Sequence, residues 1–179
     1  MRICPSYLSF ILYNPIRKAL TNRGKVLEES GINRSSVVLE VGAGNGFITE
    51  ALAQKAKKVY ALELQEGMVR KLKKRMRKFG DKVDIILGDI ATYSISSAFA
   101  DVVLMYYSFH EVGNQADAAK NISTAIKPGG KLFIYEPTIE VKKSDMQKTV
   151  KLFESAGFEK EAIHHGAFTR FARLRKKRL

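Results

Sequence analysis

The chain has 179 residues, of which 45% are hydrophobic and 27% charged, a composition typical of a globular domain rather than a disordered or membrane protein. This length provides one substantial hydrophobic core and is short for two domains. Lysine and arginine number 31 against 18 acidic residues, which gives a net charge of +13. Such a charge suits a nucleic acid, an acidic small molecule, an anionic membrane surface or simple solubility, so its position must decide among them.

The cysteine content and the N-terminal stretch bear on the cellular location. Cys4 is the only cysteine, which excludes an intrachain disulfide and a metal site built from several cysteines, so a cytoplasmic location is expected. An apolar stretch near the start lies between Pro5 and Pro15 and is too short to span a bilayer. We therefore expect no stable membrane insertion and predict an N-terminal helical or lid segment at residues 1–34.

Residues 35–179 form one predicted domain, in which short apolar runs alternate with amphipathic stretches. This alternation is typical of an α/β fold with a mostly parallel sheet. The apolar runs, rich in Val, Ile and Leu, predict strands at 37–41, 59–62, 83–87, 102–105 and 132–135. The stretches between them predict helices near residues 47–55, 66–79, 114–126 and 144–156.

The C-terminal part has a different pattern. Residues 158–164 and 168–175 are separated by a few residues that include Gly166, which predicts a β-hairpin. Parallel strands followed by a terminal hairpin form an outline that dinucleotide-binding domains and phosphate-loop proteins rarely have.

The strongest local signal is VLEVGAGNGFITE at residues 38–50, where a predicted buried strand runs directly into Gly42, Gly44 and Gly46. Glycines permit positive φ and let a ligand approach the backbone closely. A strand, a glycine turn and a helix form the nucleotide site at the carboxyl edge of doubly wound sheets. A turn of this kind without a ligand is the simpler alternative.

Two features indicate what such a loop would bind. Phe47 stands where the dinucleotide fingerprint requires a third glycine, and the Gly-Lys-Ser/Thr of the phosphate loop is absent. Glu40, two residues before the first glycine, would repel a pyrophosphate but suits a ligand that carries an ammonium and a sulfonium.

Two further acids follow predicted strands. Glu63 lies 21 residues after Gly42, where a carboxylate can accept hydrogen bonds from ribose hydroxyls, although it could instead cap the next helix. Asp89 follows the third strand, where it can bind an adenine amino group while Ile90 packs on the ring. Gly88 and Asp89 are also common turn residues, so a purely structural role is the alternative.

The chain resembles the class I S-adenosylmethionine-dependent methyltransferases over roughly residues 35–175; the motifs are VLEVGAGNG, the acid in ALEL, ILGDI, ADVVLMYYSFHEV and IKPGGKLFIYEP. The resemblance implies a Rossmann-like three-layer sandwich with a seven-stranded, mostly parallel sheet and an antiparallel last strand beside the fifth. It also implies S-adenosylmethionine as the cofactor. The block after the fourth strand is similar to the ubiquinone- and menaquinone-biosynthesis methyltransferases, and the first half to the ribosomal RNA adenine dimethyltransferases.

The same resemblance assigns the cofactor to residues of this chain. It implies that Glu63 contacts the ribose, that Asp89 and Ile90 contact the adenine, and that the methionine part lies near Glu40. The full set of predicted cofactor-binding residues is Glu40, Gly42, Ala43, Gly44, Gly46, Glu63, Leu64, Asp89, Ile90 and Tyr106.

Methyl transfer from a sulfonium depends mainly on alignment and on exclusion of water, and a general base is needed only where the acceptor loses a proton. The residues after the fourth strand should face the methyl donor, and His110 among them titrates near neutrality. His110 and Tyr107 are therefore the candidate catalytic residues. For His110, substrate contact and a structural role are the alternatives, and Glu111 either orients it or caps the next helix.

An RNA acceptor is the main alternative to a small molecule, because the chain is strongly basic. The adenine-modifying enzymes of the class carry an Asn/Asp-Pro-Pro-Tyr-like motif after the fourth strand, where this chain has Met105-Tyr106-Tyr107-Ser108. The cytosine-carbon RNA enzymes need a cysteine nucleophile, and Cys4 lies in no such motif. The basic residues cluster at 70–78 and 170–178, which the predicted topology carries away from the cofactor.

We therefore predict a small-molecule acceptor, aromatic or lipid-like, with walls that include Tyr7, Phe10 and Tyr13. A non-catalytic protein that binds the cofactor and regulates is a further alternative. Because the remaining histidines, His164 and His165, lie at the hairpin turn, no metal site is predicted.

Overall fold

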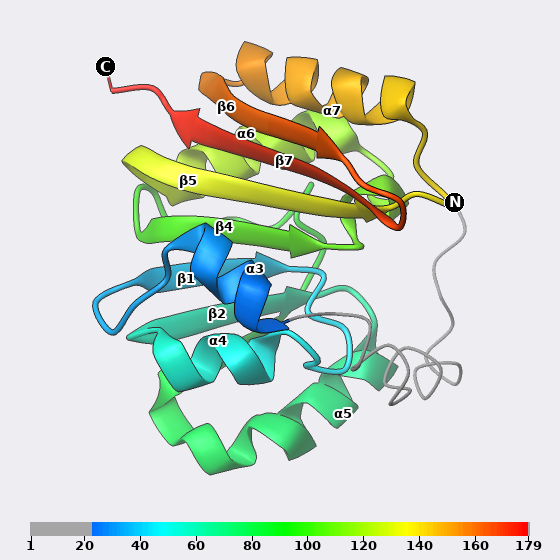
Figure 1. Cartoon of the computed structure of the whole chain (residues 1–179). Coiled ribbons are helices and arrows are strands. Elements are labelled where there is room, and N and C mark those ends of the chain that lie inside the picture. Colours follow the sequence, from blue (N-terminus) through cyan, green and yellow to red (C-terminus); the bar gives the residue numbers. More distant parts are fainter. Residues whose placement is uncertain (1–22, 179) are drawn as a thin grey trace.

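The computed structural model describes residues 23–178, which form one seven-stranded sheet with helices on both faces (Figure 1). The strand order is β3-β2-β1-β4-β5-β7-β6. The strands are β1 (Val37–Val41), β2 (Lys58–Glu63), β3 (Val83–Leu87), β4 (Ala100–Tyr106), β5 (Ile126–Pro137), β6 (Phe158–His165) and β7 (Thr169–Lys176).

The direction of the strands decides where the site lies. Strands β1 to β5 are parallel, whereas β7 is antiparallel to both β5 and β6, so β6 runs with the first five. This confirms the predicted Rossmann-like α/β fold and the hairpin inserted beside the fifth strand. The carboxyl-terminal ends of the six strands β1 to β6 therefore lie together at one edge of the sheet, which we call the carboxyl edge (Figure 1).

Two layers of helices cover the sheet. One face packs against α3 (Arg23–Ser30), α4 (Thr49–Lys55) and α5 (Glu66–Met76), and the other against α6 (Gln115–Ala125) and α7 (Lys143–Ser155) (Figure 1). Two short 3₁₀ helices, η2 (Arg77–Lys82) and η3 (Phe109–Glu111), complete the elements. Successive strand residues alternate between the two cores, as Val38 and Leu39 do, because side chains in a strand point to opposite faces.

Two details differ from the predictions. The fifth strand begins at Ile126 rather than 132, and its early part contains Pro128 beside a register shift, where a missing N–H costs little. The predicted helix at 66–79 ends at Met76 and continues as a 3₁₀ turn through Gly80, whose φ is +53°.

Helix α3 lies in the predicted segment 1–34, whereas Tyr7, Phe10 and Tyr13 lie outside the described residues. None of the helices within 23–178 combines the length and apolar composition of a membrane span.

Candidate cofactor and acceptor site

A pocket lies at the carboxyl edge and encloses about 500 Å³ of space, part of which is open to solvent. The predicted cofactor residues Gly42, Glu63, Leu64, Asp89 and Ile90 line it together. The full lining is Val41, Gly42, Leu62, Glu63, Leu64, Gln65, Gly88, Asp89, Ile90, Ser108, Glu111, Val112 and Gly113. The predicted residues that do not line it are Glu40, Ala43, Gly44, Gly46 and Tyr106, and their contact with a cofactor stays a prediction.

Gly42 forms the turn between β1 and the glycine loop. Its φ is +77°, and a Cβ at this position would lie 2.4 Å from Cβ of Ser108. The hydroxyl of Ser108 donates a hydrogen bond to the carbonyl of Val41, at 2.7 Å. The turns that follow β1 and β4 are thus in direct contact, and only glycine fits between them.

The backbone amides of the glycine loop are already bonded within the protein. Gly42 and Ala43 both donate to the carbonyl of Leu62, at 2.9 and 3.1 Å. Gly44 donates to Oε2 of Glu63 at 2.7 Å. These amides brace the loop on the end of β2 and are not offered to a phosphate, unlike those of a phosphate-binding loop.

Gly46 has a packing role. Its φ is +86°, and a Cβ there would lie 2.8 Å from Leu72 and 3.2 Å from Met76, both on α5. The glycine therefore lets the loop approach α5 closely.

Glu63 connects the glycine loop to the start of α5. Its side chain is buried, with Oε2 bonded to Gly44 and Oε1 accepting the amide of Gln65 at 2.8 Å. Gln65 is the residue before α5, so Glu63 does act near this helix start, as the structural alternative proposed. Each carboxylate oxygen has a second lone pair, which leaves acceptor capacity for hydroxyl groups in the pocket.

Asp89 also combines a turn role with a place in the pocket. Its Oδ1 accepts the amide of Ala91 at 2.9 Å, and its carbonyl accepts the amide of Tyr93 at 2.7 Å. A Cβ on Gly88 would lie 2.9 Å from the Tyr93 ring, so the turn is closely packed.

Glu40 is a buried carboxyl group with an unsatisfied oxygen. Its side chain is 2% exposed, and among the described residues Oε2 has no hydrogen-bond partner. Burial raises the pKa of Glu40 to about 8, with Thr49 opposing and the charge of Glu63 adding to the rise. At neutral pH the group is therefore protonated, and a cationic ligand nearby would favour its ionised form.

The acidic side chains of the pocket fit S-adenosylmethionine. Glu63, Asp89 and Glu111 line it, whereas the described lining includes no lysine, arginine or histidine. Carboxylates accept hydrogen bonds from hydroxyl and amino groups and attract an ammonium or a sulfonium, but they repel phosphates. This pocket is acidic although the chain carries a net charge of +13.

His110 lies beside the pocket on η3 and is held by two carboxylates. Oε1 of Glu136 accepts its backbone amide at 3.1 Å, and Oε2 of Glu136 bonds its Nδ1 at 2.5 Å. Its Nε2 lies 3.0 Å from Oε2 of Glu140. The sequence suggested Glu111 as the orienting residue, but Glu136 and Glu140 hold the ring and Glu111 lines the pocket.

The surroundings of His110 favour its charged form. Burial alone would lower the pKa of His110, but the hydrogen bond and charge of Glu136, with the charges of Glu140 and Glu111, outweigh it and raise the pKa. The neighbouring carboxylates therefore stabilise the imidazolium form of this ring relative to an isolated histidine.

Tyr106 and Tyr107 belong to an aromatic cluster on the α3 side of the sheet. Their rings stack with centroids 4.3 Å apart, and Tyr135 lies 5.6 Å from Tyr106. Tyr107 has φ +57°, a strained value for a bulky residue, and its hydroxyl lies 2.6 Å from that of Thr169. Among the described residues, Tyr107 lines no part of the pocket, so a catalytic role for it stays a prediction.

The basic clusters lie mostly away from the pocket. Helix α5 begins at the carboxyl edge and runs from it, with its acidic residue in the first turn. Its basic residues lie in the middle, at Arg70 and Lys71, and in the last turn, at Lys73, Lys74 and Arg75. The tail reaches the opposite edge, where Arg178 approaches Gly129 at the start of β5. Arg170 is an exception, because it pairs in register with Glu136 near the carboxyl edge.

Several residues at the site were not predicted. Glu136 ends β5 just as Glu63 ends β2, so the rule of an acid at a strand end could have found it. Ser108 belongs to the segment after β4 that was predicted to face the methyl donor, and it does line the pocket. Val112 and Gly113 were not singled out, because their contribution depends on how the loop folds back, which no local pattern reveals.

The sequence matches the family described as methyltransferase domain over residues 39–134. An uncharacterized methyltransferase of Geobacillus sp. is 29% identical over 144 residues, which cover 79% of this chain and 66% of that protein. A probable ribosomal RNA small subunit methyltransferase A of Pyrococcus furiosus is 45% identical over 65 residues, which cover 36% of this chain and 23% of that protein.

The fold has a solved counterpart. The crystal structure of an S-adenosylmethionine-dependent methyltransferase from Aquifex aeolicus matches with a TM-score of 0.84 at 23% identity, over 97% of this chain and 99% of that chain.

Proposed function

This chain belongs to the methyltransferase-domain family and to the class I S-adenosylmethionine-dependent enzymes, and we propose that it methylates a small molecule of aromatic or lipid-like character. The single observation that carries the choice of acceptor is the ring of carboxylates at the carboxyl edge. Glu111, Glu136 and Glu140 surround His110 there, next to the pocket.

S-adenosylmethionine, when bound, supplies a methyl group on a positively charged sulfur. Glu63 and Asp89 would hold the nucleoside part, and Glu40 would face the charged methionine part. The contact between Gly42 and Ser108 fixes the turn after β4 against the turn after β1. Holding these two turns together aligns the acceptor side with the donor side, which is the main contribution an enzyme makes to this reaction.

The carboxylates disfavour a nucleic acid as acceptor. An RNA backbone carries one negative charge at each phosphate, so it would meet unfavourable potential at Glu111 and Glu140. The basic face of α5, which would attract RNA, runs away from this edge.

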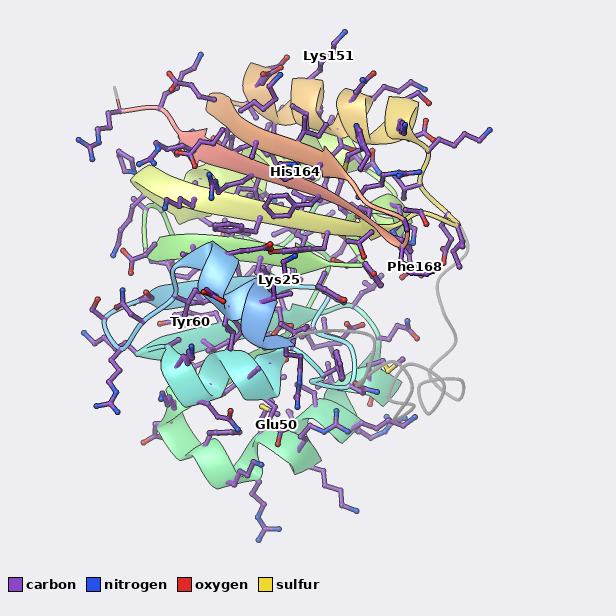
Figure 2. All side chains as sticks on the ribbon, in the orientation of Figure 1. Lys25, Glu50, Tyr60, Lys151, His164 and Phe168 are labelled. Carbon is purple, nitrogen blue, oxygen red and sulfur yellow. The ribbon has the colours of Figure 1, made fainter. Side chains whose placement is uncertain are left out.

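Two exposed apolar side chains favour an acceptor with apolar character. Ile139 is 89% exposed and Phe168 80% exposed, and they lie on adjoining turns at the carboxyl edge. Phe168 is labelled on the turn between β6 and β7 (Figure 2). Thr138 joins these turns, because its amide donates to the carbonyl of Phe168 at 3.1 Å. Large apolar groups so exposed are found at binding sites for apolar ligands.

Transfer of a radioactive methyl group tests the proposal. The chain would be incubated with methyl-labelled cofactor and either total RNA or a protein-free, RNA-free extract that holds both aqueous and organic small molecules. We expect label in the extract products and none in RNA. Label that becomes soluble only after ribonuclease treatment would contradict the proposal.

RNA methylation is the second candidate, supported by the similarity to the Pyrococcus furiosus protein over 65 residues and by the basic α5. Calorimetric titration with S-adenosylmethionine, combined with the label-transfer assay, separates the two enzymatic functions from a non-catalytic role. Binding of S-adenosylmethionine without label transfer to either fraction would favour a regulator, and absence of binding would reject the enzyme.

A further inference from the structure

We propose that Glu136 is a positioning residue that holds His110 so that Nε2 faces the acceptor, and that the acceptor takes the place of Glu140 at this nitrogen. The inference rests on the proposed function, because it gives His110 the proton that a small-molecule hydroxyl or amine loses on methylation. It identifies the acceptor class more narrowly as one that carries an ionisable O–H or N–H group.

Glu136 is committed to His110 on both oxygens. Its side chain is 2% exposed, and its two oxygens bond the backbone amide and Nδ1 of the same residue. Because a buried carboxylate strongly prefers a donor, Nδ1 keeps its proton. Nε2 is then the nitrogen that gains and loses a proton.

The partner of Nε2 differs sharply from Glu136. The Glu140 side chain is 53% exposed and lies on the turn after β5, 3.0 Å from Nε2. An ion pair with a partner so exposed contributes little to stability, so a ligand can displace it easily. The contact with Glu136 is fixed, and the contact with Glu140 is exchangeable.

The position of His110 suits this exchange. Ser108 and Glu111, on either side of it in the chain, both line the pocket. Strands β4 and β5 are adjacent and parallel, so they end at the same edge of the sheet (Figure 1). His110 follows β4 and Glu136 lies near the end of β5, which lets the two side chains meet there. His110 itself is not among the residues that line the pocket, so an acceptor that reaches Nε2 would extend from the pocket toward the turn that carries Glu140.

The proton balance is simple. The reaction starts from the neutral ring, which carries hydrogen on Nδ1 and an acceptor lone pair on Nε2; a ring in the imidazolium form first releases its Nε2 proton to water. As the acceptor's oxygen or nitrogen bonds the methyl carbon and the sulfur keeps the pair of the broken S–C bond, Nε2 takes the acceptor's proton. The ring ends as an imidazolium, which the carboxylates of Glu136, Glu140 and Glu111 stabilise.

NMR titration of the histidine side chains tests the inference without an acceptor. With ¹⁵N-labelled histidine, His110 is assigned by its loss in His110→Gln and separated from His164 and His165. In the unmodified chain we expect a titration midpoint above the ordinary histidine value and, above it, hydrogen on Nδ1. A midpoint at or below that value, or hydrogen on Nε2, would overturn the inference even if neither glutamate variant folded.

The variants sharpen the test. Glu136→Gln should lower the midpoint by at least about one pH unit and mix the two tautomers, whereas Glu140→Gln should lower it less and keep hydrogen on Nδ1. Glu154→Gln, an exposed change on α7, is the matched control and should change neither. An unchanged midpoint in Glu136→Gln, or a larger change in Glu140→Gln, would contradict the proposal.

The label-transfer assay connects the titration of His110 to the reaction. Glu136→Gln should move the midpoint of the pH–rate profile to lower pH and reduce the highest rate at least about tenfold, with cofactor affinity unchanged. An unmoved profile would reject the positioning role. If no label reaches the small-molecule fraction at all, the proposed function fails, while the NMR results still decide how Glu136 acts on His110.

Discussion

The donor half and the acceptor half of the carboxyl edge are held together by different kinds of contact. In the donor half, at the ends of β1, β2 and β3, backbone amides bond a carbonyl and the carboxylates of Glu63 and Asp89. In the acceptor half, at the ends of β4 and β5 and the start of β7, backbone bonds such as that from Thr138 to Phe168 are joined by side-chain pairs. Tyr107 pairs in this way with Thr169, and His110 with Glu140.

This difference indicates how each half can vary. Backbone bonds are available to almost any sequence, so the donor half depends on a few glycines and acids that set its shape. Side-chain pairs change with every substitution, so the acceptor half can adapt to a new molecule while the donor half stays constant. Changes in the donor half should therefore alter folding and cofactor binding together, whereas changes in the acceptor half should spare cofactor binding.

The largest effect is expected for Glu40→Gln. The folded chain keeps the proton of Glu40 up to a pH of about 8, whereas the unfolded chain loses it near 4.5. Stability therefore falls as pH rises between these values, by about 5 kcal/mol at most. Glu40→Gln should remove most of this loss, so chemical denaturation at pH 8.5 should show the variant to be more stable than the original chain.

The same variant tests cofactor binding. If the carboxylate of Glu40 faces the methionine ammonium, Glu40→Gln should weaken binding of S-adenosylmethionine by about tenfold or more. Calorimetry in buffers of different ionisation enthalpy should detect proton release on binding to the original chain at pH 7. Binding without proton release would contradict the assignment of Glu40 to the cofactor.

Gly42→Ala should have the next largest effect. The new Cβ would need positive φ and would overlap Ser108, so the free energy of unfolding should fall by about 2–4 kcal/mol. Gly44→Ala is the matched control, because its φ is also positive, at +56°, but nothing lies within 4 Å. Gly44→Ala should lower the free energy of unfolding by about 1 kcal/mol. If both variants lost the same amount, backbone strain rather than the contact between the turns would explain the effect of Gly42→Ala.

The sequence was sufficient for the donor half because its signals are local. Gly42 follows a buried strand, and Glu63 and Asp89 also stand directly after or at the end of a strand, so the parallel order of strands places them together. The terminal hairpin was also predictable, since two alternating runs flank Gly166. In the donor half, the sequence alone did not decide whether Glu63 acts on the glycine loop, on α5 or on a ligand.

The acceptor half was not predictable in the same way. Its contacts join residues far apart in the chain, 26 positions for His110 with Glu136 and 62 for Tyr107 with Thr169. Only the register of β5 with its neighbours brings them together, and that register includes an irregular start at Ile126. His110 could therefore be identified as a candidate, while its partner could not.

Tyr107→Phe should have a small effect that is confined to the acceptor half. It removes the hydrogen bond to Thr169, which is worth about 1 kcal/mol of stability. Cofactor affinity in calorimetry should stay within about twofold of the original. Thr169→Val and the double variant complete a cycle, in which a coupling near zero would mean that the hydroxyl contact contributes nothing.

The smallest effect is expected for the charges of α5. Lys73 and Lys74 are exposed, and the double change to Glu should alter the free energy of unfolding by less than about 0.5 kcal/mol. Salt at about 0.15 M screens exposed charges beyond about 8 Å, so charges on a helix that runs away from the pocket should not reach the acceptor. Label transfer to small molecules should therefore be unchanged, whereas Glu111→Lys, which places a cation in the pocket, should reduce it strongly. If the α5 change instead reduced transfer as much as Glu111→Lys, then α5 would be part of the acceptor surface, and the division of the molecule into two halves at the carboxyl edge would be wrong.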